Sequence, residues 1–485
     1  MAADFFWPSI WWADSSEDLL VARVSAQGAL RGWVHQNQYL LTVYKLKEYR
    51  LPVPPRKVIF ELGRGESLFP LREFMLLRKH DDSAAISKNE RKIGMRTTRL
   101  FRAPVSAILL ALFLLPAAAH ATDVVVACPG QKINDALAAL PQNGPNTITV
   151  TGTCNEDVSI IDVRSLTIIA GAGGAKIVQP QDSSTFDIVR SQNITLKNLE
   201  IAGVPGSTLG FGGSGVNINE ASDVQILGCD IHDNEGDGVS VNAGSLLFIR
   251  NTNIHNNNPG SGLDVNTNSS VYVRATTIQN NACAHGSPGC NSFNVGVFVA
   301  RNSVVSLRQN TLIQNNGDIG ILARLLSTVG LDFSPANTLT TIQGHNITGL
   351  FIQEGAHLQV NGTALIQGNG VGCPPENPIP CGGIVGAENA TLEFNGFGTV
   401  SGNHGAGIFV EQGTNLHLGG VTVSNNSGNG VDIRRISIGD FTPFLGSGNG
   451  SNIITGNGGA SVFCDARSLA IGNLSSFSNV KCGEN

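Results

Sequence analysis

Two neighbouring stretches, VQILGCDIHDNEGDGVSV at residues 224–241 and LFIRNTNIHNNNPGSGLDV at residues 247–265, repeat one pattern. In each, apolar and polar residues alternate, an Asn follows an apolar residue by three positions, and a glycine-containing turn precedes a second short alternating segment. Alternation with a period of two predicts short strands with one buried side. A unit this short cannot bury its apolar side alone, so a recurring copy of it predicts a solenoid of stacked coils.

The pairing of an apolar residue with an Asn three positions later continues along the chain, with a base period of 23 to 24 residues and longer steps of 29 to 35 residues. One coil has His345 where the Asn is expected. Asn tolerates a left-handed turn, and its amide can bond to the Asn of the next coil, so we predict a structural ladder. The pairs are Ile231/Asn234, Ile254/Asn257, Ile278/Asn281, Ile313/Asn316, Ile366/Asn369, Val400/Asn403, Val423/Asn426 and Ile454/Asn457.

This repeat, which covers most of residues 182–482, resembles the parallel β-helix repeat of the pectate-lyase-like superfamily. The resemblance implies an all-β fold, a right-handed parallel β-helix of about 11 to 12 coils. We expect a short N-terminal capping helix that includes Ile133 and Ala136, followed by strands at residues 147–150 and 158–160. The segment 152–158 is similar to the opening of pectin methylesterases, but that family's later catalytic motifs and the polygalacturonase signatures are absent from the sequence.

The first 121 residues differ in composition from the rest. They carry a net charge of +6 and all four Trp, whereas the remainder carries −12 and all nine Cys. A basic segment at residues 95–102, an apolar run at residues 103–118 and a small-x-small site at residues 119–121 form the pattern of a signal peptide. We expect a signal peptide at residues 95–121, a secreted mature domain at residues 122–485, and an upstream mis-start or an unstructured tail at residues 1–94. A cytoplasmic tail before a signal anchor is the alternative.

Secretion, to the extracellular space or the periplasm, favours disulfides. The acidic mature domain argues against nucleic acid and anionic membrane surfaces as partners, and we expect no membrane span in it. Cys229 is left over, and strand parity predicts a buried thiol there. The expected local pairs are Cys128 with Cys154, Cys283 with Cys290, Cys373 with Cys381, and Cys464 with Cys482.

The most charged stretch of the repeat runs from Asp230 to Asp237 and resembles the Asp-Pro-His-Asp motif of mannuronan C5-epimerases, with Ile231 in place of the proline. The resemblance implies that a His and a carboxylate exchange the proton alpha to a uronate carboxylate. Our candidate catalytic residues are His232, Asp233, Asp237 and Asp264. The competing interpretation makes His232 and His255 outward ladder positions, equivalent to Gln279, Gln314, Gln343 and Gln367.

Alternating Asp233, Glu235 and Asp237 suggest a Ca²⁺ site, because lyases of this fold use calcium to hold a uronate. Solvation of a polar turn is the alternative reading. Arg250 and Arg274 occupy equivalent positions in successive coils and should stack. Like charges in such neighbours repel, so either acidic side chains pair with these arginines or anions bind there.

The outward position of the strand after the glycine turn is apolar over five coils, at Phe298, Leu322, Phe351, Val385 and Phe409. A bare strip of this length is uncommon on a monomer. We expect it to be covered by the two Cys loops or to mediate self-association. Sugar stacking is less expected, because the mature domain has no Trp and a single Tyr, Tyr272.

Two functions remain open from the sequence. The first is a secreted protein that binds or processes polysaccharide as a lyase or an epimerase does. The second is a non-catalytic surface or matrix protein, used for structure or adhesion. Whether the chain is an enzyme is left open.

Overall fold

The computed structural model describes residues 121–179, 183–203, 213–281, 294–331, 338–373, 380–396, 398–442 and 451–484, together with the backbone of two short strands nearer the start of the chain. The chain divides into two units, Met1–Val105 and Ser106–Asn485. In the first unit, β1 (Leu19–Ala22) and β2 (Met75–Arg78) pair antiparallel. The expected signal peptide lies outside the described residues.

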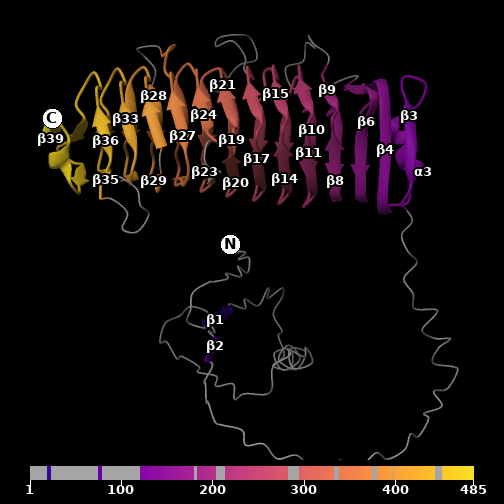
Figure 1. The fold of residues 1–485 in the computed structure, drawn as a ribbon, viewed down its shortest axis with the longest axis horizontal. Helices are drawn as coiled ribbons and strands as arrows, with labels where there is room; N and C mark the ends of the chain where they lie inside the picture. Colours follow the sequence, from indigo (N-terminus) through magenta and orange to yellow (C-terminus); the bar gives the residue numbers. More distant parts are fainter. Residues whose placement is uncertain are drawn as a thin grey trace, which may run out of the picture. The chain divides into compact units, whose positions relative to one another are not determined.

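The second unit is a right-handed parallel β-helix, in which each coil contributes a strand to each of three faces (Figure 1). Thirteen parallel strands, one per coil, form what we call face 1. Among the described residues this number of strands is close to the expected 11 to 12 coils. Face 1 consists of β5 (Val158–Ile161), β7 (Phe186–Val189), β10 (Val216–Asn219), β13 (Val239–Val241), β16 (Leu263–Val265), β19 (Val295–Val299), β22 (Ile319–Ala323), β25 (Thr348–Ile352), β28 (Gly382–Gly386), β31 (Ala406–Val410), β34 (Val431–Ile433), β37 (Val462–Asp465) and β39 (Val480–Glu484).

The other two faces belong to a 24-stranded sheet, because β3 (Asp123–Ala127), β4 (Asn143–Asn155) and β6 (Arg164–Val178) connect them at the first coils. Face 2 consists of β8 (Gln192–Lys197), β11 (Asp223–Leu227), β14 (Leu246–Arg250), β17 (Ser270–Arg274), β20 (Val304–Arg308), β23 (Thr328–Leu331), β26 (His357–Val360), β29 (Thr391–Phe394), β32 (Asn415–Leu418), β35 (Ile438–Asp440) and β38 (Leu469–Ile471). Face 3 consists of β9 (Glu200–Ala202), β12 (Asp230–His232), β15 (Asn253–His255), β18 (Thr277–Gln279), β21 (Leu312–Gln314), β24 (Thr340–Gln343), β27 (Ala364–Gln367), β30 (Gly398–Ser401), β33 (Thr422–Ser424) and β36 (Ile453–Thr455).

Apolar side chains from all three faces fill the interior, as the alternation predicts. Ile231, Ile254 and Ile278 are directly paired between coils, and each is fully buried. Burial of one such side chain contributes about 1.5–3 kcal/mol, so the repetition of a few apolar positions supplies the main stabilising energy. Cys229 is buried as expected, and burial raises the pKa of its thiol to about 11.

The Asn ladder predicted from the sequence is present at the turn after face 3. The amide of Asn257 donates to Asn281 Oδ1 at 2.8 Å, and the backbone N–H of Asn257 donates to the same oxygen at 3.1 Å. The next member, Asn281, bonds to Asn316 in the same way at 3.0 Å. These buried side chains therefore fix the register of successive coils rather than take part in chemistry.

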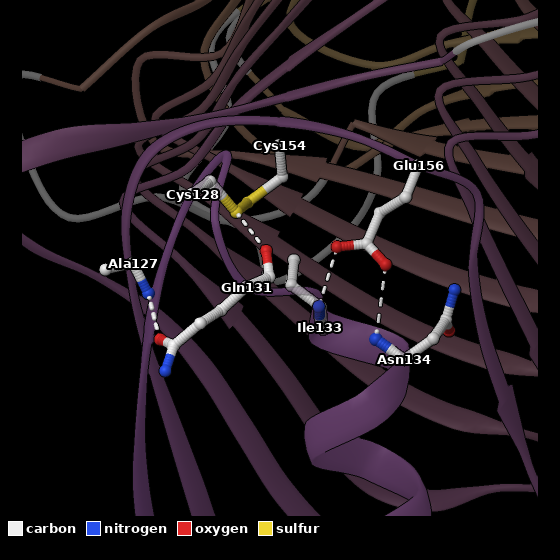
Figure 2. Close-up of a disulfide and its surroundings, with 7 residues drawn as sticks. All are labelled: Ala127, Cys128, Gln131, Ile133, Asn134, Cys154 and Glu156. Atoms are coloured by element: carbon white, nitrogen blue, oxygen red, sulfur yellow. Dashed lines mark hydrogen bonds between the residues drawn. A yellow bond between two sulfur atoms is a disulfide. The ribbon is translucent and has the colours of Figure 1, made fainter.

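Both ends of the solenoid are closed. The helix α3 (Ile133–Ala139) covers the first coil with Ile133 and Ala136 buried, and the carboxylate of Glu156 accepts the N–H groups of Ile133 at 2.6 Å and Asn134 at 3.2 Å (Figure 2). The Cys128–Cys154 disulfide lies beside this contact. At the other end, the Cys464–Cys482 disulfide joins β37 and β39, the last two strands of face 1, and the 3₁₀-helix η1 (Leu474–Ser476) lies between these strands in the sequence.

Three of the four expected disulfides are formed, the third being Cys373–Cys381. Cys283 and Cys290 lie outside the described residues. Disulfides are typical of an oxidising compartment such as the extracellular space or the periplasm. Among the described residues, no helix is long and apolar enough to span a membrane.

Candidate functional site

The charged stretch from Asp230 to Asp237 lies across the turn that joins face 3 to face 1, and it divides into two groups of side chains. The first group surrounds His232, which is the last residue of β12. Its Nδ1 lies 2.8 Å from Asp233 Oδ2, and its Nε2 lies 3.2 Å from Glu200 Oε1 in the preceding coil. Lys176 Nζ, one coil further, donates to the same Glu200 oxygen at 2.6 Å. Lys176 and His232 therefore lie on either side of one carboxylate oxygen, and the Lys176 bond is the main cause that lowers the pKa of Glu200.

The two histidines of the stretch stack as neighbours in a ladder. His232 pairs with His255 of the next coil, and their ring centroids lie 5.1 Å apart with an interplanar angle of 11°. His255 pairs in turn with Gln279, whose side chain begins a column of glutamine bonds. The interpretation of His232 and His255 as outward ladder positions is thus confirmed, and the column continues through Gln314, Gln343 and Gln367.

This geometry limits what His232 can do. Both ring nitrogens face carboxylates, which only accept hydrogen bonds. Both contacts are therefore hydrogen bonds only when each ring nitrogen carries a proton. The side chain is also only 13% exposed. A proton-abstracting base needs a nitrogen lone pair that reaches the substrate. His232 would have to give up a contact with Asp233 or Glu200 to act in this way.

The second group contains Asp237 and Asp264, which belong to successive coils at face 1. Asp237 follows the turn, and its carboxylate accepts the backbone N–H of Ser261 at 2.7 Å. Ser261 lies three residues before Asp264 in the sequence. Asp264 is the outward residue of β16 and accepts a hydrogen bond from the amide of Asn266. Asp264 therefore lies one coil after Asp237.

Asp264 ends a column of polar side chains on face 1. The register places Asp187, Asn217, Ser240 and Asp264 directly above one another on β7, β10, β13 and β16. Asn217 donates to Asp187 Oδ1 at 2.9 Å. The next strand brings Phe298, so the polar part of face 1 ends at Asp264. A polymer lying along these coils would meet polar side chains first and the two carboxyl groups at their end.

At neutral pH Asp237 favours the ionised form, whereas Asp264 favours the protonated form. Burial raises the pKa of Asp237 to about 6. Burial, followed by the negative charge of Asp237, raises the pKa of Asp264 to about 8, although the charge of Arg301 acts in the other direction. Two close carboxyl groups with separated pKa values make a pair in which one holds a proton while the other can accept one.

The four candidate residues therefore form two pairs: His232 with Asp233, and Asp237 with Asp264. Among the described residues, no hydrogen bond or ion pair joins one pair to the other. Lys176 and Glu200 were missed by the sequence reasoning. The signal for Glu200 is present, since it precedes Ile201 as Asp230 precedes Ile231, but the longer step between these two coils separates them in the sequence.

The carboxylates suggested for calcium do not converge. Asp233 faces His232 and Asp237 faces Ser261, and within the described part of the chain the three acids do not form a group with ligand atoms within 4.8 Å of one another. One such group exists, formed by Cys128, Cys154 and Glu156, but its sulfur atoms are bonded to each other. Binding of Ca²⁺ at Asp233, Glu235 and Asp237 thus requires side-chain movement and stays a prediction.

The apolar strip is present and is mostly covered. Leu322, Phe351, Val385 and Phe409 are at most 8% exposed and pack with Ile319 and Ile347 in a hydrophobic cluster separate from the interior of the coils, whereas Phe298 is half-buried. At the C-terminal end of the strip, the guanidinium of Arg434 lies 5.6 Å from the centroid of the Phe409 ring. Its Nε forms an ion pair with Asp432 Oδ1 at 2.8 Å. Little of the strip remains for a partner chain, and self-association through it stays a prediction.

Comparison with known proteins agrees with the fold. Residues 147–333 match the protein-family model described as "Right handed beta helix region". Together with the parallel sheets, this match shows that the chain is a right-handed parallel β-helix repeat protein, as the resemblance to the pectate-lyase-like superfamily implied. A search among curated protein sequences finds no match.

Several solved structures are similar to this chain over much of its length. The periplasmic alginate epimerase AlgG is 11% identical over 75% of this chain and 84% of its own, with a TM-score of 0.36. The pectate lyase Pel9A is 14% identical over 75% of this chain and 79% of its own, with a TM-score of 0.30. The GH136 lacto-N-biosidase from Eubacterium ramulus is 10% identical over 76% of this chain and 68% of its own, with a TM-score of 0.34. At these values the likeness carries no argument about activity.

Proposed function

We propose that this protein modifies an extracellular polysaccharide by acid–base chemistry, with Asp264 as proton donor and Asp237 as proton acceptor at the polar end of face 1. The observation that carries the proposal is the placement of two interacting, partly buried carboxyl groups in adjacent coils at face 1. The fold alone does not assign an activity, so the argument depends on these side chains. The long side face of a solenoid suits an extended polymer.

The reaction class we favour is that of a lyase or an epimerase. Either reaction removes the proton alpha to a uronate carboxylate, and an ionised Asp237 supplies the base. A protonated Asp264 then returns a proton to the sugar carbon in an epimerase, or gives one to the departing glycosidic oxygen in a lyase. Asp187 and Asn217, which lie further along the same column, would orient the sugar by hydrogen bonds.

His232 and Asp233 are proposed as a supporting pair. With both ring nitrogens directed to carboxylates, His232 holds Asp233 and Glu200 on either side of the β12 strand end. The turn that follows carries Asn234 and leads to Asp237, so this network fixes the start of the turn. Substitution of His232 should therefore reduce turnover less than substitution of Asp264.

The experiment uses proton exchange as its main readout. The full chain is incubated in D₂O with a panel of uronate polymers, and NMR follows deuterium at the sugar carbon next to the carboxylate. Deuterium without chain cleavage indicates an epimerase, and an unsaturated sugar end indicates a lyase. New reducing ends without either signal would point to hydrolysis and contradict the proposed reaction class.

The control variants are Asp264→Asn and Asp237→Asn for the pair, and Asp123→Asn for an exposed carboxylate at the first strand. Loss of exchange in the pair variants alone supports the proposal. Failure of the unmodified protein to exchange or cleave any polymer of the panel would contradict it and favour the structural rod, for which the continuous Asn and Gln ladders are the supporting observation.

Calcium is proposed only as a separate test. If Ca²⁺ raises the thermal unfolding midpoint, and Asp233→Ala and Asp237→Ala remove the rise, the three acids rearrange into a metal site. If the midpoint does not change, the calcium hypothesis is rejected, and the acid–base pair is unaffected.

A further inference from the structure

The most basic column of the solenoid lies on face 2, away from the carboxyl pair of face 1. Arg250, Arg274 and Arg308 pair directly in the register of β14, β17 and β20. Neighbouring strands are about 4.8 Å apart, so the three arginines follow one another along the coils. The side chain of Arg308 turns towards Ser306, to whose Oγ its Nε donates at 3.0 Å. Repulsion between the like charges of Arg250 and Arg274 disfavours this arrangement unless an acidic side chain or a bound anion lies nearby.

Two of these arginines have no acidic partner. Among the described residues, neither Arg250 nor Arg274 forms an ion pair, although arginines elsewhere do, such as Arg324 with Glu354 and Arg434 with Asp432. Arg250 is exposed and Arg274 is half-buried. The alternative left open by the sequence, that acidic side chains neutralise this column, is therefore not realised at these two positions.

An aromatic side chain lies next to the arginines. Tyr272 is 42% exposed, pairs with Phe248 of the previous coil, and has the guanidinium of Arg308 5.9 Å from its ring centroid. The next residue in the Tyr272 column is Ser306, whose hydroxyl accepts a hydrogen bond from Arg308 Nε at 3.0 Å, so the Arg308 side chain lies beside the ring. A depression of about 140 Å³ results, and its lining residues are Phe248, Tyr272, Val273, Arg274, Arg308 and Gln309.

We propose that this depression, together with Arg250 next to Arg274 in the same column, is a secondary binding site on face 2 for a linear polysaccharide that carries a carboxylate or a sulfate on each sugar. An arginine fork recognises such a group through paired hydrogen bonds, and a partly exposed tyrosine ring gives the apolar side of a sugar a surface to lie on. A line of arginines at the strand spacing meets successive charged sugars of an extended chain. Because the mature domain is acidic overall, with a net charge of −12, a polyanion would bind here rather than elsewhere on it.

The two proposed sites would have different roles. The carboxyl pair acts on the polymer at face 1, whereas the arginine column on face 2 holds a neighbouring segment or a second chain. The binding proposal does not require that the protein be an enzyme, since a matrix protein would use the same column for attachment. Binding and turnover can therefore fail independently.

The test is equilibrium binding of the full chain to polyuronates, to a sulfated glycan and to a neutral glucan, at low and at physiological salt. We expect binding to the anionic polymers alone, weakened by salt. Arg250→Gln, Arg274→Gln and Tyr272→Ala should each weaken it by about tenfold or more, because each removes a charge-assisted or stacking contact. A preference between the polyuronate and the sulfated glycan identifies which anion the site takes.

Two controls separate this site from the rest of the protein. Arg467→Gln removes an exposed positive charge near the C-terminal end and should leave binding unchanged. Asp264→Asn should lower turnover by about a hundredfold or more but retain binding, which distinguishes a failure of this proposal from a failure of the proposed activity. The unfolding midpoint of each variant shows whether it has folded. If Arg274→Gln or Tyr272→Ala does not fold, Arg250→Gln still tests the proposal, because the Arg250 side chain is exposed and its replacement should not disturb folding.

Absence of binding to any anionic polymer, equal binding of the neutral glucan, or an equal loss in Arg467→Gln would overturn the proposal.

Discussion

The imidazole of His345 replaces an asparagine amide next to Asn316 in the ladder. Its Nδ1 accepts the backbone N–H of Asn316 at 3.2 Å, and its Nε2 lies 3.3 Å from the carbonyl oxygen of Ile313. A neutral ring with its proton on Nε2 satisfies both contacts. The backbone N–H of His345 donates to Asn369 Oδ1 at 3.2 Å, so the ladder continues without interruption.

We predict that His345 makes the protein sensitive to acid. Burial lowers the pKa of His345 from 6.5 to about 4. The stability that this neutral ring contributes is complete above pH 6.5 and is lost as the pH falls through about 4, because the unfolded chain binds the proton first. The loss amounts to about 3 kcal/mol. His345→Asn should have little effect at neutral pH and should raise the unfolding midpoint relative to the unmodified protein near pH 4.5.

The exposed His404 provides the matched control, since His404→Asn should leave the pH dependence unchanged. Parallel unfolding curves for the unmodified protein and His345→Asn at every pH would contradict the assignment. His345→Ala should destabilise at all pH values, because it leaves the buried N–H of Asn316 without an acceptor.

A second prediction concerns the N-terminal cap. Glu156 is 7% exposed and accepts two N–H groups at the start of α3. Glu156→Gln should weaken the cap by about 1–2 kcal/mol, because an amide oxygen and an amide nitrogen replace two accepting oxygens. In a solenoid the loss is local, so hydrogen exchange should increase in β3 and α3 while the central coils remain protected. Asp135→Asn, at an exposed acid of the same helix, is the control, and equal exchange in both variants would refute the role of Glu156.

The sequence predicted this fold well because one unit is repeated. Inward and outward positions of each strand follow from alternation, and the columns Phe298, Leu322, Phe351 and Arg250, Arg274 have the register that the sequence predicts. Coil number and the capping helix also agree with expectation.

The candidate site was predicted less completely, because contacts between coils depend on the lengths of the connecting segments and on side-chain directions. Glu200 reaches His232 across 32 residues, and Asp233 turns to His232 rather than towards Glu235 and Asp237. Periodicity assigns a residue to a face but not its partner around a turn. The same limit explains why acidic partners for Arg250 could be neither named nor excluded from the sequence.

A third prediction links Asp264 to stability. A carboxyl group with a raised pKa contributes fully below its unfolded value of 3.8, and this contribution is lost as the pH rises through about 8. Asp264→Asn removes the group that ionises. At pH 8 this variant should therefore unfold at a higher midpoint than the unmodified protein, with a free energy of unfolding that is larger by roughly 1 kcal/mol or more. The difference should shrink towards pH 4. Asp123→Asn should show no such trend. A lower midpoint for Asp264→Asn at pH 8 would mean that the ionised carboxylate stabilises the coil and would remove the basis for its role as a proton donor.

The last prediction is the pH profile of the proposed reaction. Activity requires an ionised Asp237 and a protonated Asp264, so kcat/KM should rise through about pH 6, fall through about pH 8 and be greatest between them. The two limbs belong to an interacting pair, in which the negative charge of Asp237 helps to raise the pKa that sets the alkaline limb of Asp264. Asp264→Asn should lower kcat/KM by about a hundredfold or more and remove the alkaline limb, whereas the acid limb should stay near pH 6, because Asp264 is already uncharged where Asp237 ionises. His232→Gln, which keeps a polar ladder side chain, should retain both limbs. A profile whose acid limb disappears in His232→Gln would instead assign the titrating base to His232 and reverse the roles proposed for the two pairs.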